Sequence, residues 1–292
     1  MLNVYYMSMP DPHSEPFTGE VLARLAATRN PRLRQLLDAA VRHLHAFARE
    51  VSLRPEEWRR GLEFLTATGK QCTAQHQEFI LLSDVLGLTT LVNRLRDPSH
   101  ATQSSVLGPL YRANAPQLAL GSSLTLVQAG RADAVGREVV MYGRVCGEDG
   151  EGLAGAELDV WLTDEEGLYD SQAHGPDVLD HRARFVADLQ GRYWFRTTLP
   201  KGYSIPMDGP VGEMVRAMRQ HGMRPAHIHA WVRATGWRDL VTALYFQGDP
   251  YLATDAAFGV TPELVIEVLP PSATSPIPAL ERIAYDFRLA RE

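Results

Sequence analysis

The sequence predicts a mixed fold, with a helical N-terminal domain over residues 1–115 and an all-β antiparallel sandwich over residues 116–292. From about residue 19 to residue 95, apolar residues recur at the three- and four-residue spacing of amphipathic helices. Further along the chain the apolar period changes to two, and short strand-like runs alternate with turn signals such as GEDGEG and QGDP. Many short strands without helices between them favour an antiparallel sandwich.

One helix of the N-terminal domain has a clear start and one apolar face. Asn30 precedes Pro31, which predicts a helix with Asn30 as its cap and proline at its first position. The residues that follow place these apolar side chains on one stripe: Leu33, Leu36, Leu37, Ala40, Val41, Leu44, Phe47, Ala48 and Val51. Residues 55–72 and 74–96 have a similar spacing. Such helices are too apolar to stand alone, so we expect them to pack on each other, on the second domain or on a partner subunit.

The second domain contains a series of predicted strands, REVVMYGRV, AELDVWLTD, RYWFRTTL, HIHAWVRA, LVTALYF and ELVIEVL. In the second of these runs, one face is formed by Ala156, Leu158, Val160 and Leu162. The segment GPVGEMVRAMRQHGMRPAH predicts a short helix or a long excursion between strands.

Composition argues against several classes of partner. The chain has 292 residues, with 29 basic and 35 acidic residues and a net charge of −6, and it contains no long run of one sign. This balance argues against nucleic acid or a membrane surface as the main partner. Cys72 and Cys146 are far apart, which does not support a disulfide framework, and no apolar run approaches the ~18 residues of a membrane span. No secretory signal is evident. We therefore expect a soluble protein of the reducing cytoplasm.

Two histidines separated by one residue, His227 and His229, stand in a run that is otherwise typical of a buried strand. Pro225 disfavours a helix just before them. Residues i and i+2 of a strand face the same way, so both imidazoles would point to one place. This pattern indicates a metal site, and two buried structural histidines are the alternative. The same spacing at His43 and His45 lies in a helical pattern, where the rings point about 200° apart and cannot share a ligand.

Further metal ligands are not evident from the residues alone. No cysteine accompanies the histidine pair, and the acidic residues Asp159, Asp164, Asp170, Asp188 and Asp208 are scattered. Tyr169 and Tyr203 each follow a predicted strand, but a loop tyrosine usually buries its ring and leaves its hydroxyl in water. A zinc hydrolase that uses His227 and His229 would give these tyrosines no role. Neither a nucleophile elbow nor a phosphate-binding glycine loop is present.

A series of segments matches a known family: LGPLYRANAP, LDVWLTDEEGLYD, FVADLQGRYWFRTTLPKGYSIPMDGPVG, RPAHIHAWV and QGDPYLATDAAFGV, with FLTATGKQC and QEFILLSDVLGLTTLV in the helical domain. In these segments the chain resembles the intradiol ring-cleaving dioxygenases. The resemblance covers almost the whole of the predicted sandwich, and it implies that this second domain is the catalytic one.

The resemblance implies one mononuclear non-haem Fe(III) per subunit, ligated by Tyr169, Tyr203, His227 and His229. Phenolate is a hard anionic donor that suits the ferric ion. The implied substrates are a small aromatic diphenol and O2, and the ring opens between its two hydroxylated carbons to give a dicarboxylic acid. Tyr203 is expected to leave the metal and accept a substrate proton, and Arg224 to stabilise developing negative charge.

The subgroup is predicted from YSIPMDGPVG, EFILLSDVLG and YLATDAAFGV, which look most like hydroxyquinol 1,2-dioxygenases, enzymes that convert benzene-1,2,4-triol to maleylacetate. That resemblance implies substrate-binding roles for Leu81, Asp84, Val106, Leu107, Gly108, Ile205, Pro206 and Ala257. Asp84 would accept a hydrogen bond from the third ring hydroxyl. Against this, GPLYRANAP is closer to the catechol subgroup. Ala243 falls where catechol enzymes commonly carry glutamine, and the loss of that polar side chain argues against catechol specificity and against normal turnover. Cleavage of catechols to muconates and a metal-binding sandwich without catalysis are the alternatives.

The same resemblance implies a homodimer whose contact is formed by the N-terminal helices, with a lipid-like molecule between the subunits. The apolar stripe from Leu33 to Val51 is consistent with that contact and equally with packing inside one chain.

Overall fold

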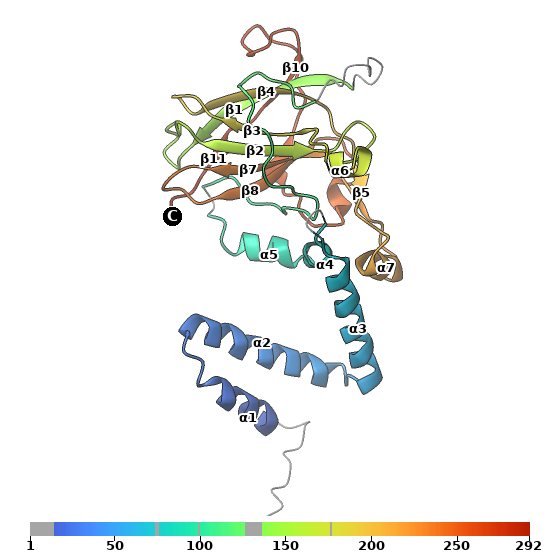
Figure 1. Cartoon of the computed structure of the whole chain (residues 1–292). Helices are drawn as coiled ribbons and strands as arrows, with labels where there is room; N and C mark the ends of the chain where they lie inside the picture. The colour runs from blue at the N-terminus through green and yellow to red at the C-terminus, as the bar shows by residue number, and fades with distance from the viewer. Residues whose placement is uncertain (1–14, 74–75, 99, 126–135, 176) are drawn as a thin grey trace, which may run out of the picture. The chain divides into compact units, whose positions relative to one another are not determined.

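The computed structural model describes residues 15–73, 76–98, 100–125, 136–175 and 177–292 (Figure 1). The chain divides into one unit of residues 1–66 and a second unit of residues 67–292. The domain boundary expected at residue 115 stays a prediction. A helical region followed by a sheet-rich region, as the sequence predicts, is what the structure contains.

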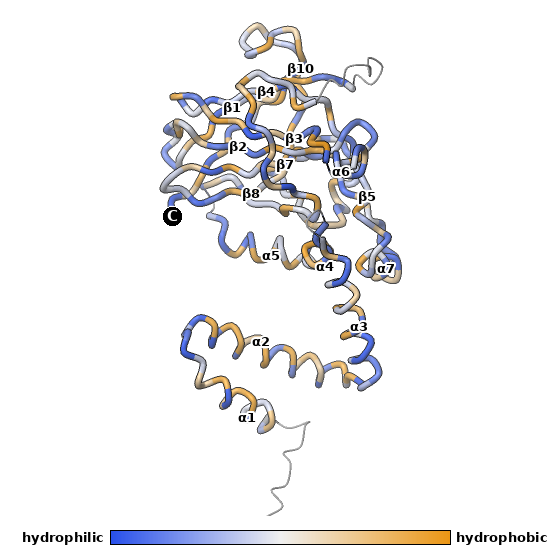
Figure 2. Tube along the Cα trace, viewed as in Figure 1, coloured by the Kyte–Doolittle hydropathy of each residue, from blue (hydrophilic) through white to orange (hydrophobic). Residues whose placement is uncertain are grey.

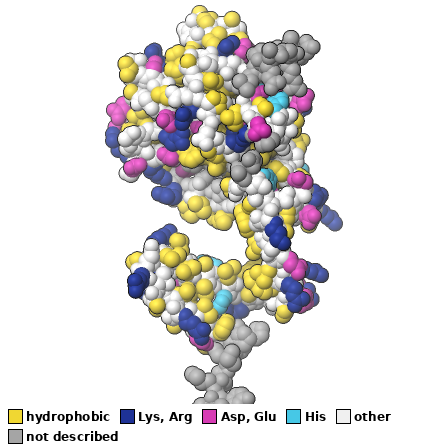
Figure 3. Space-filling model, in the orientation of Figure 1, with side chains coloured by type: hydrophobic (Ala, Val, Ile, Leu, Met, Phe, Trp, Pro, Cys, Tyr) yellow, Lys and Arg dark blue, Asp and Glu magenta, His cyan; other side chains and the backbone are white. Residues whose placement is uncertain are grey.

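The first unit is helical and exposes an apolar stripe. It contains α1 (Glu15–Leu25), α2 (Pro31–Glu50) and the start of α3 (Pro55–Gln71), and α1 packs against α2. Asn30 caps α2 as predicted, because its side-chain oxygen accepts a hydrogen bond from the backbone N–H of Leu33 at 3.0 Å. The stripe predicted on α2 is not buried, since Leu44 and Phe47 are 59% and 51% exposed. Figure 2 shows hydrophobic residues along α2, and Figure 3 shows hydrophobic side chains on the surface of this unit. Periodicity specifies an apolar face but not what covers it.

The second unit holds the remaining helices, which are short. They are α4 (Glu78–Val85), α5 (Leu88–Arg94), α6 (Asp170–Ala173) and α7 (Pro210–Ala217), with 3-10 helices η1 (Leu252–Thr254) and η2 (Pro262–Leu264). The helix α7 lies inside the segment for which the sequence predicts a short helix or an excursion. No described helix is long and apolar enough to cross a membrane.

Within the residues that the structure describes, the strands of the second unit form two larger sheets and one small ladder. The strands are β1 (Glu138–Cys146), β2 (Glu157–Leu162), β3 (Arg182–Val186), β4 (Arg192–Thr198), β5 (Tyr203–Ser204), β6 (Met223–Arg224), β7 (His227–Arg233), β8 (Leu240–Phe246), β9 (Val265–Ile266), β10 (Glu281–Ala284) and β11 (Phe287–Arg288). One sheet joins β1 to β4, β10 and β11, and the other has the order β3-β2-β7-β8-β9. The strands β5 and β6 pair with each other. The predicted runs correspond to β1, β2, β4, β7, β8 and β9.

The prediction of a wholly antiparallel domain is corrected by three parallel pairings. The strands β10 and β11 run parallel to β1, and β9 runs parallel to β8. Hairpin-like neighbours such as β7 and β8 are antiparallel, as expected. The parallel strands return from distant parts of the chain, and a long connection leaves the strand direction free.

The two larger sheets share one apolar core. Side chains on the strand faces that point away from this core are available to form a site. Phe195 from the first sheet and Ile228 from the second belong to this core. Because successive residues of a strand face opposite sides, His227 and His229 lie on the other face of β7 from Ile228. On that face a second buried cluster gathers, composed of Leu110, Trp161, Tyr169 and Tyr203.

Candidate active site

The four predicted metal ligands converge in the structure. The Nε2 atoms of His227 and His229 are 3.0 Å apart, and Oη of Tyr169 lies 3.5 Å from Nε2 of His227. The Tyr203 ring centroid lies 5.3 Å from that of Tyr169 and 5.6 Å from that of His227. All four side chains are buried, and the most exposed of them, Tyr203, is 5% exposed. Two imidazole nitrogens and two phenols thus lie close together in one buried region of the protein.

The Tyr169 loop is anchored by a buried ion pair. Asp170, the next residue, accepts hydrogen bonds from Nε and Nη2 of Arg182, both at 2.7 Å. Arg112 adds a third guanidinium contact to the same carboxylate at 3.2 Å. Tyr203 is positioned by strand pairing instead of an ion pair: it lies on β5, directly opposite Arg224 of β6. Bidentate arginine–carboxylate pairs fix geometry as well as charge, so the backbone beside Tyr169 is tightly held.

Burial sets the protonation states of the imidazoles. Burial, and secondarily the charge of Arg224, lowers the pKa of His227 to about 3, and burial lowers the pKa of His229 well below its usual range. Both rings are therefore neutral. In His227 the Nδ1–H donates to the carbonyl of Pro225 at 2.7 Å, which leaves the lone pair on Nε2. A metal ligand needs this neutral form.

The tyrosines complete a donor set that suits one metal cation. Burial and the neighbouring Tyr203 raise the pKa of Tyr169 well above its ordinary value of 10.0, so a phenolate at this place requires a cation beside it. Among the described residues, no group of three or more His, Cys, Asp or Glu side chains could hold a metal. Any metal at His227 and His229 would therefore draw its anionic ligands from tyrosine.

A positively charged side chain is aimed at the same space. Nη1 of Arg224 lies 3.3 Å from Nε2 of His227. Neighbouring side chains hold the guanidinium in this position. Asp255 accepts from Arg224 Nε at 2.9 Å and Nη2 at 3.2 Å, and Tyr245 Oη lies 3.0 Å from Nη2. Ser105 continues the chain of contacts, with Oγ 2.8 Å from Tyr245 Oη. Burial raises the pKa of Asp255, but Arg224 more than offsets it, so the pKa ends below the ordinary value and the pair is ionic.

Comparison with known proteins decides the family. The family model described as Dioxygenase matches residues 106–291, and the model described as Catechol dioxygenase N terminus matches residues 30–104. The chain belongs to the intradiol ring-cleavage dioxygenases. It is 44% identical to the 6-chlorohydroxyquinol 1,2-dioxygenase of Cupriavidus pinatubonensis, over 85% of this chain and 88% of that protein. It is 42% identical to a hydroxyquinol 1,2-dioxygenase of Rhizobium sp., over 85% of this chain and 83% of that protein.

Solved structures agree with this assignment. The crystal structure of hydroxyquinol 1,2-dioxygenase from Pseudomonas putida superimposes with a TM-score of 0.81, at 36% identity, over 95% of this chain and 98% of that chain. Catechol 1,2-dioxygenase from Pseudomonas arvilla gives a TM-score of 0.76 at 26% identity, over 96% of this chain and 93% of that chain. This protein is therefore an aromatic-ring-cleaving enzyme of the intradiol type.

The predicted substrate-binding residues of this intradiol dioxygenase differ in how deeply they are buried and in what they contact. The following are buried: Leu81, Asp84, Val106, Ile205 and Ala257. Leu107 packs against the cluster that contains both tyrosines, and Pro206 is half-buried. Gly108 lies beside the site, because a Cβ added there would be 3.7 Å from Nε2 of His229. Its φ of 80° also favours glycine.

Asp84 is the polar member of this set. It lies on α4 and is 1% exposed, and its Oδ1 has no hydrogen-bond partner among the described residues. Burial raises its pKa to about 6, although Thr89 and Arg224 oppose this shift. A buried carboxyl with unused hydrogen-bonding capacity can accept a bond from a ligand hydroxyl.

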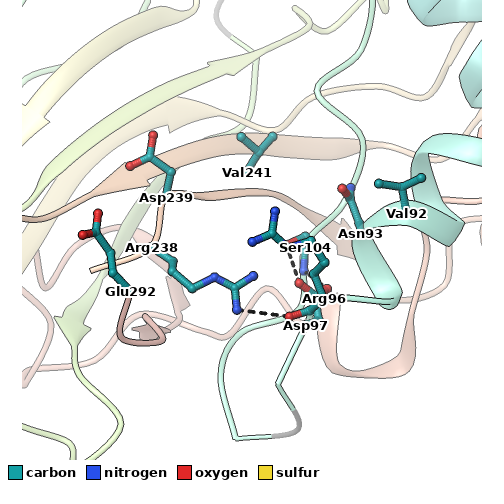
Figure 4. A pocket seen from close by; sticks show the side chains of 9 residues that line it. All are labelled: Val92, Asn93, Arg96, Asp97, Ser104, Arg238, Asp239, Val241 and Glu292. Carbon is teal, nitrogen blue, oxygen red and sulfur yellow. Dashed lines mark hydrogen bonds between the residues drawn. The ribbon is translucent and has the colours of Figure 1, made fainter. Parts of the chain in front are cut away.

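A different pocket of about 610 Å³ shares no residue with this site (Figure 4). It is lined by Val92, Asn93, Arg96, Asp97, Ser104, Arg238, Asp239, Val241 and Glu292. Arg238 donates to the backbone carbonyl of Arg96 at 3.1 Å, and Asp97 accepts from Ser104. Asp239 accepts a hydrogen bond from Nε1 of Trp231 at 3.1 Å, and the pocket is lined by neither the histidines nor the tyrosines of the site.

Sequence reasoning missed the residues that support the site. Trp161, Tyr245 and Asp255 contact the predicted ligands or the arginine, and none was singled out. A signal for Trp161 did exist, because it alternates with Val160 and Leu162 on a strand whose other face is core. Asp255 and Ser105 come from segments far from Arg224, and only the tertiary structure joins them.

Proposed function

We propose that this protein cleaves hydroxyquinol (benzene-1,2,4-triol) with O2 to maleylacetate, at one Fe(III) per subunit. The observation that carries the proposal is the convergence of two buried tyrosines on two neutral imidazoles whose Nε2 atoms are 3.0 Å apart. The substrate is supported by the relatives named hydroxyquinol and 6-chlorohydroxyquinol 1,2-dioxygenase, at 42% and 44% identity.

Tyr169, Tyr203, His227 and His229 would hold the iron. When bound, the ferric ion supplies a Lewis-acid and electron-accepting centre for the diphenolate and O2. The two phenolates offset much of its charge, and the neutral rings offer lone pairs without adding charge. Burial of all four ligands excludes bulk water, which strengthens each electrostatic contact in the site.

Arg224 and Tyr203 would manage charge and protons on the substrate. The Arg224 guanidinium is held by Asp255 and Tyr245, so its Nη1 stays near the ligands without reorganisation. There it stabilises negative charge that develops on the ring oxygens. Tyr203 Oη takes up a hydroxyl proton of the incoming diphenol, which requires the phenolate form that a bound cation creates.

Asp84 is the residue that we assign to the third hydroxyl of the substrate. Its buried Oδ1 lacks a partner among the described residues, and a diphenol without a third hydroxyl would leave it so. An unpaired buried polar group costs ~1–3 kcal/mol. Catechol and substituted catechols are the second candidates, because the chain is also 34% identical to a catechol 1,2-dioxygenase of Candida albicans over 87% of its length.

We also propose a homodimer that uses the N-terminal helices, with a lipid-like molecule at the contact. The support is the exposed stripe on α2, whose large apolar members are Leu33, Leu36, Leu37, Leu44, Phe47 and Val51. Contiguous exposed apolar surface of this kind marks an interaction site.

The free Cys72 and Cys146 fit a reducing compartment, for which we propose the cytoplasm.

The visible absorption spectrum of the purified protein, taken before and after anaerobic addition of hydroxyquinol or catechol, tests the proposal. A coloured protein whose band shifts on addition supports tyrosinate ligation of Fe(III) and direct binding of the diphenol. Oxygen uptake with formation of maleylacetate, at higher kcat/KM than formation of muconate from catechol, supports the substrate. A colourless protein with full metal occupancy would contradict the ligand set, and a preference for catechol would move the protein to the second candidate.

A further inference from the structure

The two histidines of the site are oriented by different forces. His227 donates Nδ1–H to the Pro225 carbonyl at 2.7 Å, which fixes the rotation of its ring. His229 has no such restraint, because its buried Nδ1 finds no hydrogen-bond partner among the described residues. Metal-binding histidines almost always donate their second ring N–H to an acceptor, and this bond sets ring orientation. Something else must therefore orient His229.

An indole ring lies flat against His229. The Trp161 and His229 rings are stacked, with centroids 4.7 Å apart and planes 6° apart. The contact is built into the sheet, because Trp161 of β2 is the direct cross-strand neighbour of His229 of β7. Directly opposed residues on adjacent strands face the same side and lie within side-chain contact.

Trp161 is itself immobilised. It is 1% exposed, and the ring of Tyr111 meets it edge-on at 4.9 Å with an interplanar angle of 62°. Tyr111 is fixed in turn by its hydroxyl, which donates to Asp159 at 2.9 Å. The ring of His227 meets His229 edge-on, with centroids 4.5 Å apart and an interplanar angle of 84°. Two further neighbours are small: Ala243 is the cross-strand partner on β8, and Gly108 approaches Nε2. Among the described ring contacts of this imidazole, the indole is thus the one that lies face to face with it.

We infer that Trp161 is a positioning residue that orients His229 by stacking, in the place of the usual hydrogen bond to the second ring nitrogen. This inference rests on the proposed function insofar as His229 is a metal ligand. A flat contact confines the tilt of the imidazole but not its rotation within its own plane. His229 is therefore the ligand whose geometry depends on an aromatic surface, whereas the geometry of His227 depends on a backbone carbonyl.

Three variants separate stacking from simple packing. Trp161→Leu removes the aromatic face, and Trp161→Phe keeps a smaller one. Trp194→Leu is the matched control, because Trp194 lies on β4 in the other large sheet and has no described ring contact with Tyr111 or with either histidine. Each iron-loaded protein is given excess chelator, and the release rate of iron and the Fe(III) electron paramagnetic resonance spectrum are recorded.

Trp161→Leu is expected to release iron about 10-fold faster than the unmodified protein and to broaden the Fe(III) signal, in the range found when groups that orient metal ligands are lost. Trp161→Phe should restore most of the difference, and Trp194→Leu should match the unmodified protein. Equal release rates and spectra for Trp161→Leu and the unmodified protein would overturn the inference. Equal losses for Trp161→Leu and Trp161→Phe would do the same, because packing volume rather than an aromatic face would then be responsible.

A second measurement on iron-free protein distinguishes this inference from the proposed function. With histidine labelled in its ring, a stacked His229 gives one sharp set of proton resonances, displaced by the ring current of the indole. We expect these signals in the unmodified protein, and broadened or multiple signals in Trp161→Leu. If the unmodified protein binds no iron but shows this pattern, the ligand assignment fails and the stacking role stands. If the His229 signals are the same with and without Trp161, the stacking role fails.

Discussion

Arg224 and Asp255 form a bidentate ion pair in the interior of the protein, with nitrogen–oxygen distances of 2.9 and 3.2 Å and both side chains 2% exposed. The two residues are separated by 31 positions in the chain. A buried guanidinium without its partner would be an uncompensated charge. The pair therefore ties the orientation of the site arginine to the stability of the whole second unit.

Asp255→Asn should lower both stability and activity. Breaking a buried pair typically costs ~3–5 kcal/mol, because one charge is left unpaired. We expect a loss of that size in urea unfolding, together with a lower kcat, since Arg224 is no longer held. Glu281→Gln, which breaks an exposed pair with Arg137, should leave the unfolding midpoint unchanged. If both variants unfold alike, the buried pair is not a stabilising element.

Tyr245→Phe removes the hydroxyl that contacts Arg224. The variant loses the contacts of Tyr245 Oη with Arg224 Nη2 at 3.0 Å and Ser105 Oγ at 2.8 Å. A hydrogen bond to a charged group contributes ~1.5–3 kcal/mol, so kcat/KM should fall roughly 10-fold or more while iron content stays constant. Tyr193→Phe is the control, because its hydroxyl bonds to the Tyr285 carbonyl at 2.7 Å, outside the site. A parallel loss of iron would indicate that Tyr245 supports the ligands instead.

Tyr169→Phe should abolish the visible band. This change removes one phenolate donor but keeps the ring that packs against Tyr203. We expect much weaker iron retention and loss of the tyrosinate charge-transfer absorption. Tyr193→Phe is the matched control, because its hydroxyl donates to the Tyr285 carbonyl, outside the site. An unchanged spectrum in Tyr169→Phe would exclude this tyrosine from the ligand set.

Asp84 makes stability depend on pH in a direction opposite to that of most carboxylates. Its folded pKa of about 6 exceeds the ordinary value of 3.8, so the folded protein binds this proton more tightly than the unfolded chain does. Below 3.8 both states are protonated. Between 3.8 and about 6 the contribution of Asp84 to stability falls as pH rises, and above 6 the penalty is constant at ~3 kcal/mol.

Asp84→Asn should remove this dependence. The stability of the variant minus that of the unmodified protein, measured by urea unfolding, should grow from pH 4 to about pH 6 and then level off. The difference isolates Asp84 from the other titrating groups. A difference that does not change with pH would show that Asp84 titrates in the folded protein as it does in the unfolded chain.

Asp84→Ala should change substrate preference. If this carboxyl accepts a bond from the third ring hydroxyl, kcat/KM for hydroxyquinol should fall by roughly 10–100-fold, while the value for catechol stays within a few fold. Ser83→Ala is the neighbouring control, since Ser83 Oγ bonds to Thr89 Oγ1 at 2.8 Å. Equal losses on both substrates would assign Asp84 a structural role.

The sequence by itself determined the local pattern of the site. Pro225 and the strand-like run after it predicted a strand with His227 and His229 on one face, and β7 confirms this strand. The Asn30–Pro31 start predicted α2 correctly. These features follow from backbone stereochemistry over a few residues, which a single sequence expresses directly. The two tyrosines that we propose as ligands were different, because only family resemblance singled them out from other loop tyrosines.

The tertiary structure decided what lies beside these local elements. It placed β10 and β11 parallel to β1, and it left the stripe of α2 exposed, although periodicity alone suggested a buried face. It also brought Trp161 onto His229 and Asp255 onto Arg224. Strand register, burial and ion pairing between distant segments depend on long-range packing, which side-chain period cannot encode. The sequence specified the strand that carries both histidines, and the fold specified which side chains pack against them.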